Sequence, residues 1–316
     1  MEQRSAVPLT SAGCFAAVLL IIAAVSVYVP LFRPFGLVLI PLPLLLMYMK
    51  FSLRYAVLTA VAGILLMAFF LGPVAALMEG LMSLVGLALG IGFRRNWNST
   101  RLLVCVTAAL VVIWSVGLAI SFVVSGINPI TEILQNMNVF IDEMMAAQQS
   151  QMSLSERMQY ASEMEVFKTM MPAMIPFIMC MGMAIIGYVN IKVSQLVLKR
   201  MGIDVKPFLP IRYWEIPRVM IYLYVLGMVM KYWGTTRQID WLVGLGLNLY
   251  GIGYFFITFA GLAFVFALLH QRFKLRTSIQ VLLAIFLFVF PPCALMLFFL
   301  GLFDMLWQYR KKHDMV

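Results

Sequence analysis

The sequence predicts an all-α, polytopic transmembrane helical bundle, and three observations predict it. Hydrophobic residues make up 63% of the 316, charged residues only 11%, and the mean hydropathy is +0.98. A soluble domain is about half apolar and roughly a quarter charged, so most of this apolar surface must face lipid. Unpaired backbone groups are too costly in hydrocarbon, and the alternating pattern of barrel strands is absent. Helices are therefore the expected form.

The apolar residues gather into nine runs, and a helix needs about 20 apolar residues to cross the hydrocarbon layer. The runs lie at about 12–31, 35–49, 55–71, 74–92, 102–124, 172–198, 218–231, 242–269 and 278–303. The second run is short and interrupted by Pro41 and Pro43, so we expect it to be re-entrant or tilted. The last contains Pro291-Pro292, which should break or kink it. We expect about eight full spans plus this Pro-broken final run.

The basic connectors predict the orientation of the spans. Short cytoplasmic loops carry an excess of Lys and Arg. Four clusters lie an even number of crossings apart: Lys50 and Arg54; Arg94, Arg95 and Arg101; Lys199, Arg200, Lys206, Arg212 and Arg218; and Arg272, Lys274 and Arg276. We therefore expect these clusters and the N-terminus to face the cytoplasm. The basic tail from Arg310 to Lys312 conflicts with a single ninth crossing. Either the last run folds as a hairpin at Pro291-Pro292, which we favour, or the tail is an exception.

The longest polar stretch, about 125–171, is expected outside the cytoplasm. It holds six acids against two basic residues, and apolar residues from Ile130 to Met145 recur at helical spacing. Ser153 and Glu156 form a capping box that opens a second helix. The two helices either lie on the membrane surface or form a lid over an outward-facing cavity. The chain is thus divided into an N-terminal membrane bundle (1–124), an acidic extracytoplasmic segment (125–171) and a C-terminal membrane bundle (172–316).

Several classes of function find no support in the sequence. The four cysteines are widely separated and form no C-x-x-C pair, so neither a zinc site nor a redox motif is expected. No nucleic-acid-binding motif accompanies the net charge of +10. There is no H-E-x-x-H, nucleophile elbow or P-loop, and the two histidines, His270 and His313, lie at run ends. We expect neither an enzyme nor a bound cofactor or metal.

Glu79 is the most informative single residue because an ionised group inside a span is costly. It shares a helical face with small residues, among them Ser83, Gly86 and Gly90, and the Gly86-x-x-x-Gly90 spacing allows close helix approach. The acid should therefore point into the bundle, with Arg33 as a possible ion-pair partner. Two interpretations stay open: a structural pairing or neutral hydrogen-bonded acid, and a contact to a cation, proton or substrate.

The eighth run carries a second polar stripe at helical spacing. Its polar members are Asn248, Tyr254 and Thr258, accompanied by Gly244 and Gly251. The glycine pairs are not a dinucleotide-binding fingerprint because no strand precedes them. Close helix packing is one interpretation of the stripe, and a cavity lining is the other.

The C-terminal half resembles the YybS-like family of bacterial predicted membrane proteins, a domain of unknown function. The residues that carry the resemblance occur in the order Pro210, Trp214, Pro217, Asn248, Gly261, Pro292, Gly301, Asp304 and Arg310. The N-terminal half resembles the family more loosely, through its short Pro-rich second span and Gly-rich fourth span. It is also similar in outline to the substrate-binding subunits of energy-coupling-factor transporters, through Ala12-x-x-x-Ala16 and Gly13-x-x-x-Ala17. The family resemblance implies a multi-pass protein of a bacterial cytoplasmic (inner) membrane and no particular reaction.

Two functional hypotheses follow. The first is small-solute or cation binding or transport in a cavity bounded by the fourth and eighth helices, with Glu79, Ser83, Asn248, Tyr254 and Thr258 as ligand-binding residues. The second is a non-transporting scaffold that holds envelope-assembly or signalling partners through its cytoplasmic basic loops. It predicts a tightly packed bundle and a partner that depends on the segment from Arg212 to Arg218. Apart from such a protein partner or small-molecule ligand, the expected partner is the lipid bilayer.

Overall fold

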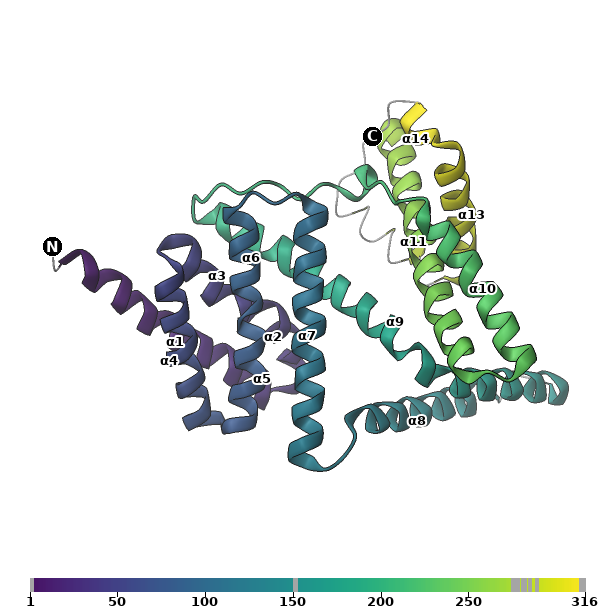
Figure 1. The fold of residues 1–316 in the computed structure, drawn as a ribbon, viewed down its shortest axis with the longest axis horizontal. Helices are drawn as coiled ribbons and strands as arrows, with labels where there is room; N and C mark the ends of the chain where they lie inside the picture. Colours follow the sequence, from purple (N-terminus) through teal and green to yellow (C-terminus); the bar gives the residue numbers. More distant parts are fainter. Residues whose placement is uncertain are drawn as a thin grey trace. The chain divides into compact units, whose positions relative to one another are not determined.

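The computed structural model describes residues 3–149, 153–273, 279, 283, 286–287 and 290–312, and every regular element in these residues is a helix (Figure 1). The chain divides into two compact units. Unit 1 comprises Met1–Glu132 with Met179–Phe208, and unit 2 comprises Ile133–Ile178 with Leu209–Val316. The helix that carries the sixth apolar run therefore contributes to both units. The sequence predicted three parts (1–124, 125–171 and 172–316), and whether these are independent domains stays a prediction.

The helices follow the apolar runs closely in the first half of the chain. They are α1 (Gln3–Tyr28), η1 (Pro30–Phe32), α2 (Arg33–Leu39), α3 (Pro41–Lys50), α4 (Leu53–Leu71), α5 (Pro73–Ser83), α6 (Val85–Arg94) and α7 (Ser99–Ser125). The later elements are α8 (Pro129–Gln149), α9 (Leu154–Arg200), η2 (Ile211–Tyr213), α10 (Val219–Arg237), α11 (Asp240–Phe273), α13 (Pro291–Trp307) and α14 (Tyr309–Lys312).

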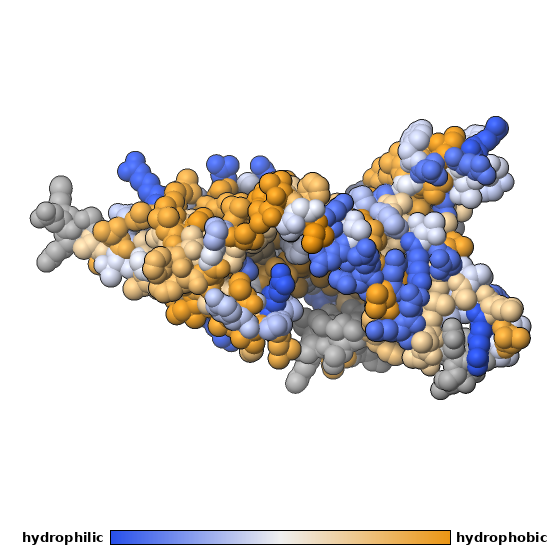
Figure 2. All heavy atoms as spheres, turned by 90° about the horizontal axis from the view of Figure 1, so that it is seen from below, coloured by the Kyte–Doolittle hydropathy of each residue, from blue (hydrophilic) through white to orange (hydrophobic). Residues whose placement is uncertain are grey.

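Seven helical stretches in the described residues are long and apolar enough to cross a membrane. They are Ala6–Tyr28, Pro30–Lys50, Leu53–Leu71, Pro73–Arg94, Ser99–Ser125, Leu154–Arg200 and Asp240–Gln271. The seventh predicted run forms α10, whose last turns carry Lys231 and Arg237. The ninth run includes the shorter apolar helix α13. Hydrophobic side chains cover much of the face in Figure 2, as expected for a surface solvated by lipid. The predicted all-α polytopic bundle is confirmed.

In unit 1, glycines allow helices to approach closely. A Cβ atom on Gly86 would overlap the carbonyl of Pro41, and one on Gly90 would overlap the ring of Tyr48. Helices α3 and α6 therefore pack backbone against backbone, as the Gly86-x-x-x-Gly90 spacing indicates. The second run is helical throughout except at Ile40, and it forms one candidate span of 21 residues from Pro30 to Lys50.

The proline break in this second span has a specific partner. Pro41 has no N–H to donate to the Leu37 carbonyl four residues earlier. The Nδ2 atom of Asn190, from α9, donates to that carbonyl at 3.1 Å, and Asn190 is fully buried. A side chain 153 positions away in the sequence thus satisfies the backbone group that the proline leaves open.

Helix α9 is longer than the apolar runs predict. One half of the predicted capping box is present at its start: Glu156 Oε2 accepts the Ser153 N–H at 2.8 Å and the Ser153 hydroxyl at 2.6 Å. The helix that opens there does not end before the sixth span but runs 47 residues to Arg200, with Pro172 and Pro176 inside it. At 1.5 Å per residue this is about 70 Å, more than twice the hydrocarbon thickness of about 30 Å, so a large part of α9 extends beyond one crossing.

In unit 2, α11 packs closely against α10 and α13, again at glycines. A Cβ on Gly227 of α10 would overlap the backbone of Tyr250. Gly261 of α11 and Gly301 of α13 face each other, because a Cβ on either would overlap a backbone carbonyl of the opposite helix. Pro291-Pro292 lies in the first turn of α13, after Phe290 at φ −89°, where a proline is tolerated. The predicted hairpin with its turn at Pro291-Pro292 needs a first limb over 278–290, most of which lies outside the described residues.

Candidate functional site

An ion pair between Asp304 and Arg310 is buried at the end of α13. Helix α13 ends at Trp307, and Gln308 adopts the left-handed conformation with φ +51°. This reversal brings the next turn back, so that Arg310 Nε donates to Asp304 Oδ2 at 2.7 Å and the Arg310 backbone N–H donates to Oδ1 at 3.1 Å. Asp304 is 5% exposed and Arg310 is 4% exposed. One carboxylate therefore both neutralises the guanidinium and caps the start of α14.

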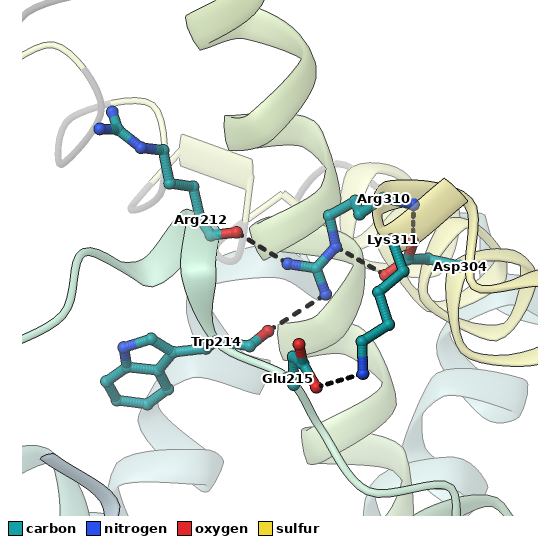
Figure 3. Close-up of polar contacts among 6 residues, drawn as sticks. All are labelled: Arg212, Trp214, Glu215, Asp304, Arg310 and Lys311. Atoms are coloured by element: carbon teal, nitrogen blue, oxygen red, sulfur yellow. Dashed lines mark hydrogen bonds and ion pairs between the residues drawn. The ribbon is translucent and has the colours of Figure 1, made fainter. Parts of the chain in front are cut away.

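The same guanidinium holds a connecting segment, built around the short 3-10 helix η2, that lies almost 100 residues earlier in the chain. Nη1 of Arg310 donates to the carbonyl of Arg212 at 2.9 Å, and Nη2 donates to the carbonyl of Trp214 at 3.1 Å (Figure 3). These carbonyls belong to residues 209–217, which we call the 209–217 segment. All three nitrogens of the Arg310 side chain have acceptors, which is the condition for burying this charge at tolerable cost.

Further contacts fix the 209–217 segment at each side. Trp214 Nε1 donates to the Leu209 carbonyl at 3.0 Å, and its ring lies 5.2 Å from that of Phe259 in α11. Lys311 Nζ lies 2.9 Å from Glu215 Oε2, although both side chains are more than half exposed and the pair stabilises little. Immediately after the segment, Arg218 donates from Nε to the Met305 carbonyl and from Nη2 to that of Leu306.

We call this constellation the Asp304–Arg310 cluster; its members are Arg212, Trp214, Glu215, Arg218, Asp304, Arg310 and Lys311. An adjoining cavity of about 70 Å³ is lined by several of them together with Ile216, Met305 and Gln308. That volume accommodates a few water molecules rather than an organic solute. The cluster can hold a backbone segment in a fixed shape at the end of a helix pair. It offers no nucleophile with an adjacent base.

Asn248, predicted to line a cavity, lies where α11 meets α9. Its Nδ2 atom donates to the carbonyls of Ala173 and Gly244, each at 2.7 Å, and its Oδ1 accepts the N–H of Phe177 at 2.9 Å. The carbonyl of Ala173 and the N–H of Phe177 are four residues apart, an ordinary helical pair that Asn248 bridges next to Pro176. The carboxamide is therefore committed to the backbone of α9 and α11.

Three other predicted ligand-binding residues have internal partners as well. The Thr258 hydroxyl donates to the Tyr254 carbonyl of its own helix at 2.8 Å, and Thr258 is buried. The Tyr254 ring stacks on Phe298 of α13 with centroids 5.0 Å apart. In α5 the Ser83 hydroxyl donates to the Gly80 carbonyl at 2.6 Å. These contacts are those of packed helices, in line with the close-packing interpretation of the eighth-run stripe.

Glu79 lies half-buried on α5. The exposed Arg33 is the charged group that acts on it electrostatically. Among the described residues, the two side chains form no hydrogen bond and no ion pair within 4 Å. Glu79 belongs to unit 1 and Asn248 to unit 2. Neither residue lines the 70 Å³ cavity or a second, water-sized one at Trp97 and Lys206. A ligand role for Glu79 stays a prediction. No group of three acids, cysteines or histidines in the described residues could hold a metal ion.

The structure brings together most of the residues that carried the family resemblance. Trp214, Asp304 and Arg310 belong to the cluster, Gly261 and Gly301 form the close crossing of α11 with α13, and Pro210 and Pro217 flank η2. Asn248 lies apart, against α9. Sequence reasoning missed the pairing of Asp304 with Arg310 and the part played by Arg218. An aspartate and an arginine six residues apart were visible in the sequence. This spacing does not by itself indicate that the two side chains form an ion pair.

The fold and this cluster define a polytopic helical membrane protein with an ordered connecting segment at one end. The chain belongs to the family described as Predicted membrane protein (DUF2232), whose model matches residues 17–305. That match includes Asp304 and ends before Arg310. A similar protein is "Uncharacterized protein YybS" of Bacillus subtilis (strain 168), 24% identical over 299 residues, which cover 92% of this chain and 94% of the relative. No solved structure matches. The likeness to energy-coupling-factor subunits is not supported by these comparisons.

Proposed function

We propose that this protein is a non-transporting membrane scaffold that presents the 209–217 segment to a protein partner at the cytoplasmic face of a bacterial inner membrane. The observation that carries the proposal is the contrast between two sets of polar groups. Inside the spans, the polar atoms of Ser83, Asn248 and Thr258 are committed to helix backbone. At the end of α13, a buried ion pair is committed to holding an irregular segment in one shape.

The charge around the segment points to the chemistry of the partner. Arg218, Lys311 and Lys312 are exposed beside it, while Glu215 offsets part of their charge. Complementary potentials steer encounter and set specificity, so the partner would bring an acidic surface. The positive-inside pattern of the connectors supports a cytoplasmic location for this face and for the N-terminus. The proposal assigns the chain no catalytic role.

Site-specific photocrosslinking in living cells tests the scaffold. A crosslinking amino acid at position 215, beside the cluster, should capture a protein of defined mass. The same group at Leu226, which is 49% exposed on α10, should capture none. Arg310→Met should abolish the adduct, because it releases the segment, while the variant still purifies as a monodisperse species. An adduct that survives Arg310→Met unchanged, or no adduct at position 215, would overturn the proposal.

Small-solute or cation binding is a second candidate, and Glu79 is the observation that favours it. An acid within a span marks a functional site by default, and this one is half-buried without an ion pair among the described residues. A bound solute raises apparent stability by mass action. Thermal unfolding of the detergent-purified protein across a panel of cations and metabolites should then show a shift that Glu79→Gln removes and Ser83→Ala reduces. A ligand shift of equal size in the Glu79→Gln variant would exclude Glu79 from binding.

A further inference from the structure

Helix α8 exposes an apolar stripe along its length. Ile133, Met137, Phe140 and Met144 recur at intervals of four, three and four residues, which places them on one side of the helix. Their exposed fractions run from 39% at Met137 to 61% at Phe140. A stripe of large apolar side chains is costly in water, so this one requires a cover.

The charged residues of α8 are all acidic. At 100° per residue, Glu132 and Glu143 lie beside the stripe and Asp142 lies opposite it, and the helix contains no Lys or Arg. Two copies of α8 packed along their stripes would bring the flanking acids Glu132 and Glu143 near those of the other copy without any cation of the helix between them. A second copy of the helix is therefore a poor cover.

The start of α8 is tied to the end of a span. Helix α7 ends at Ser125, and Gly126 has φ +69°, a conformation that favours glycine. The Oδ1 atom of Asn128 then accepts the N–H of Ile130 at 3.0 Å, so a second helix begins at once. The four Cα–Cα steps from Ser125 to Pro129 reach at most about 14 Å. The first turn of α8 must lie about as close as that to the point where the chain leaves the membrane.

A second tie lies about 13 residues further along the helix. Asp142 Oδ1 of α8 accepts a hydrogen bond from Lys168 Nζ of α9 at 2.6 Å, and the Lys168 side chain is 17% exposed. Lys168 is four residues before Pro172, where the apolar run of the sixth span begins. The helix is thus held near the membrane at two points separated along its axis by about 20 Å.

We propose that α8 is an interfacial helix, whose stripe at Ile133, Met137, Phe140 and Met144 is covered by the lipid surface of the bilayer. A helix tied at two such points lies along the surface, and an amphipathic helix in this position buries its apolar side about 5–10 Å into the boundary between headgroups and acyl chains. Because the polar side carries only acids, the interaction does not depend on anionic lipids. The stripe enters a bilayer of zwitterionic lipid.

Fluorescence quenching in proteoliposomes tests the location of the stripe. The full-length protein, with Cys14, Cys105, Cys180 and Cys293 replaced by Ala, is labelled at Phe140→Cys with an environment-sensitive fluorophore and reconstituted in phosphatidylcholine. Gln135→Cys is the matched control, because five residues at 100° each place it about 140° around the same helix. Both positions are exposed, so neither change disturbs the packed core.

The label at Phe140 should be quenched by nitroxide groups near the top of the acyl chain and little by iodide in the buffer. The label at Gln135 should show the reverse. Equal iodide quenching at the two positions would overturn the proposal, since the stripe would then face water. Protection of the Phe140 label from both quenchers would overturn it too, because protein, as a lid or a partner, would be the cover.

Discussion

Removing Arg310 should destabilise the protein far more than removing its neighbour Lys311. Arg310→Met breaks three side-chain hydrogen bonds and leaves the carboxylate of Asp304 buried without a counter-charge. Breaking a buried pair by removing one partner costs about 3–5 kcal/mol. Lys311→Met removes an ion pair whose two side chains are 56% and 54% exposed, and such pairs contribute less than about 1 kcal/mol.

A double-mutant cycle separates the ion pair from general damage. Asp304→Leu alone leaves Arg310 with its two carbonyl acceptors, and we expect a loss of about 3 kcal/mol. With both changes together, no uncompensated charge remains. The double variant should therefore be more stable than the sum of the single losses predicts, by about 1–3 kcal/mol.

The free energy of unfolding is measured in mixed micelles as the fraction of denaturing detergent rises, with tryptic cleavage after Arg212 as a local probe. Arg310→Met should accelerate that cleavage, and Lys311→Met should not. Equal losses of stability for Arg310→Met and Lys311→Met, or strict additivity of Asp304→Leu and Arg310→Met, would refute the role of the buried ion pair in holding the 209–217 segment.

Three other changes test the packing around the site by the same unfolding assay. Gly301→Ala forces a methyl group against the backbone of α11 and should cost about 1–3 kcal/mol, whereas Gly182→Ala, with open space around its Cβ position, should cost little; equal losses would contradict the close crossing. Asn248→Leu removes the hydrogen bonds to backbone groups of α9 and should lower the free energy of unfolding by about 1–2 kcal/mol. The control Thr258→Val removes only a hydrogen bond within α11 and should lower it by less than about 1 kcal/mol. Asn98→Ala removes the N-cap of α7, where Asn98 Oδ1 accepts the Arg101 N–H at 2.9 Å, and should cost about 1 kcal/mol; an unchanged midpoint would show that this cap is not needed.

Features that depend on local spacing could be predicted from the sequence. The apolar runs became helices because the hydrocarbon requirement acts on each stretch of about 20 residues separately. The close approach of α6 to α3 could be predicted because two glycines four residues apart, Gly86 and Gly90, lie on one side of a helix. The capping box of Ser153 and Glu156 likewise depends on residues three apart.

Features that depend on distant partners could not be predicted. The Asp304–Arg310 pair requires Gln308, a non-glycine residue, to adopt positive φ, and its other acceptors lie 96 and 98 residues earlier. The continuation of α9 through Pro172 into the sixth span was unexpected because proline ordinarily breaks a helix. Beside Pro176, Asn248 binds the Ala173 carbonyl and the Phe177 N–H of α9 from a position 71 residues after Phe177. Residue type and spacing within one helix do not indicate which distant residues will contact it.

The long separation between Arg212 and Arg310 has a consequence for biogenesis. The 209–217 segment emerges from the ribosome before α11, α13 and the turn at Gln308 exist, so its contacts to Phe259 and Arg310 cannot form until those residues are made. A chain that stalls or is cut short before Arg310 leaves an arginine-bearing loop loose and open to membrane-associated proteases. Completion of synthesis and protection from degradation are thereby linked through a single guanidinium group.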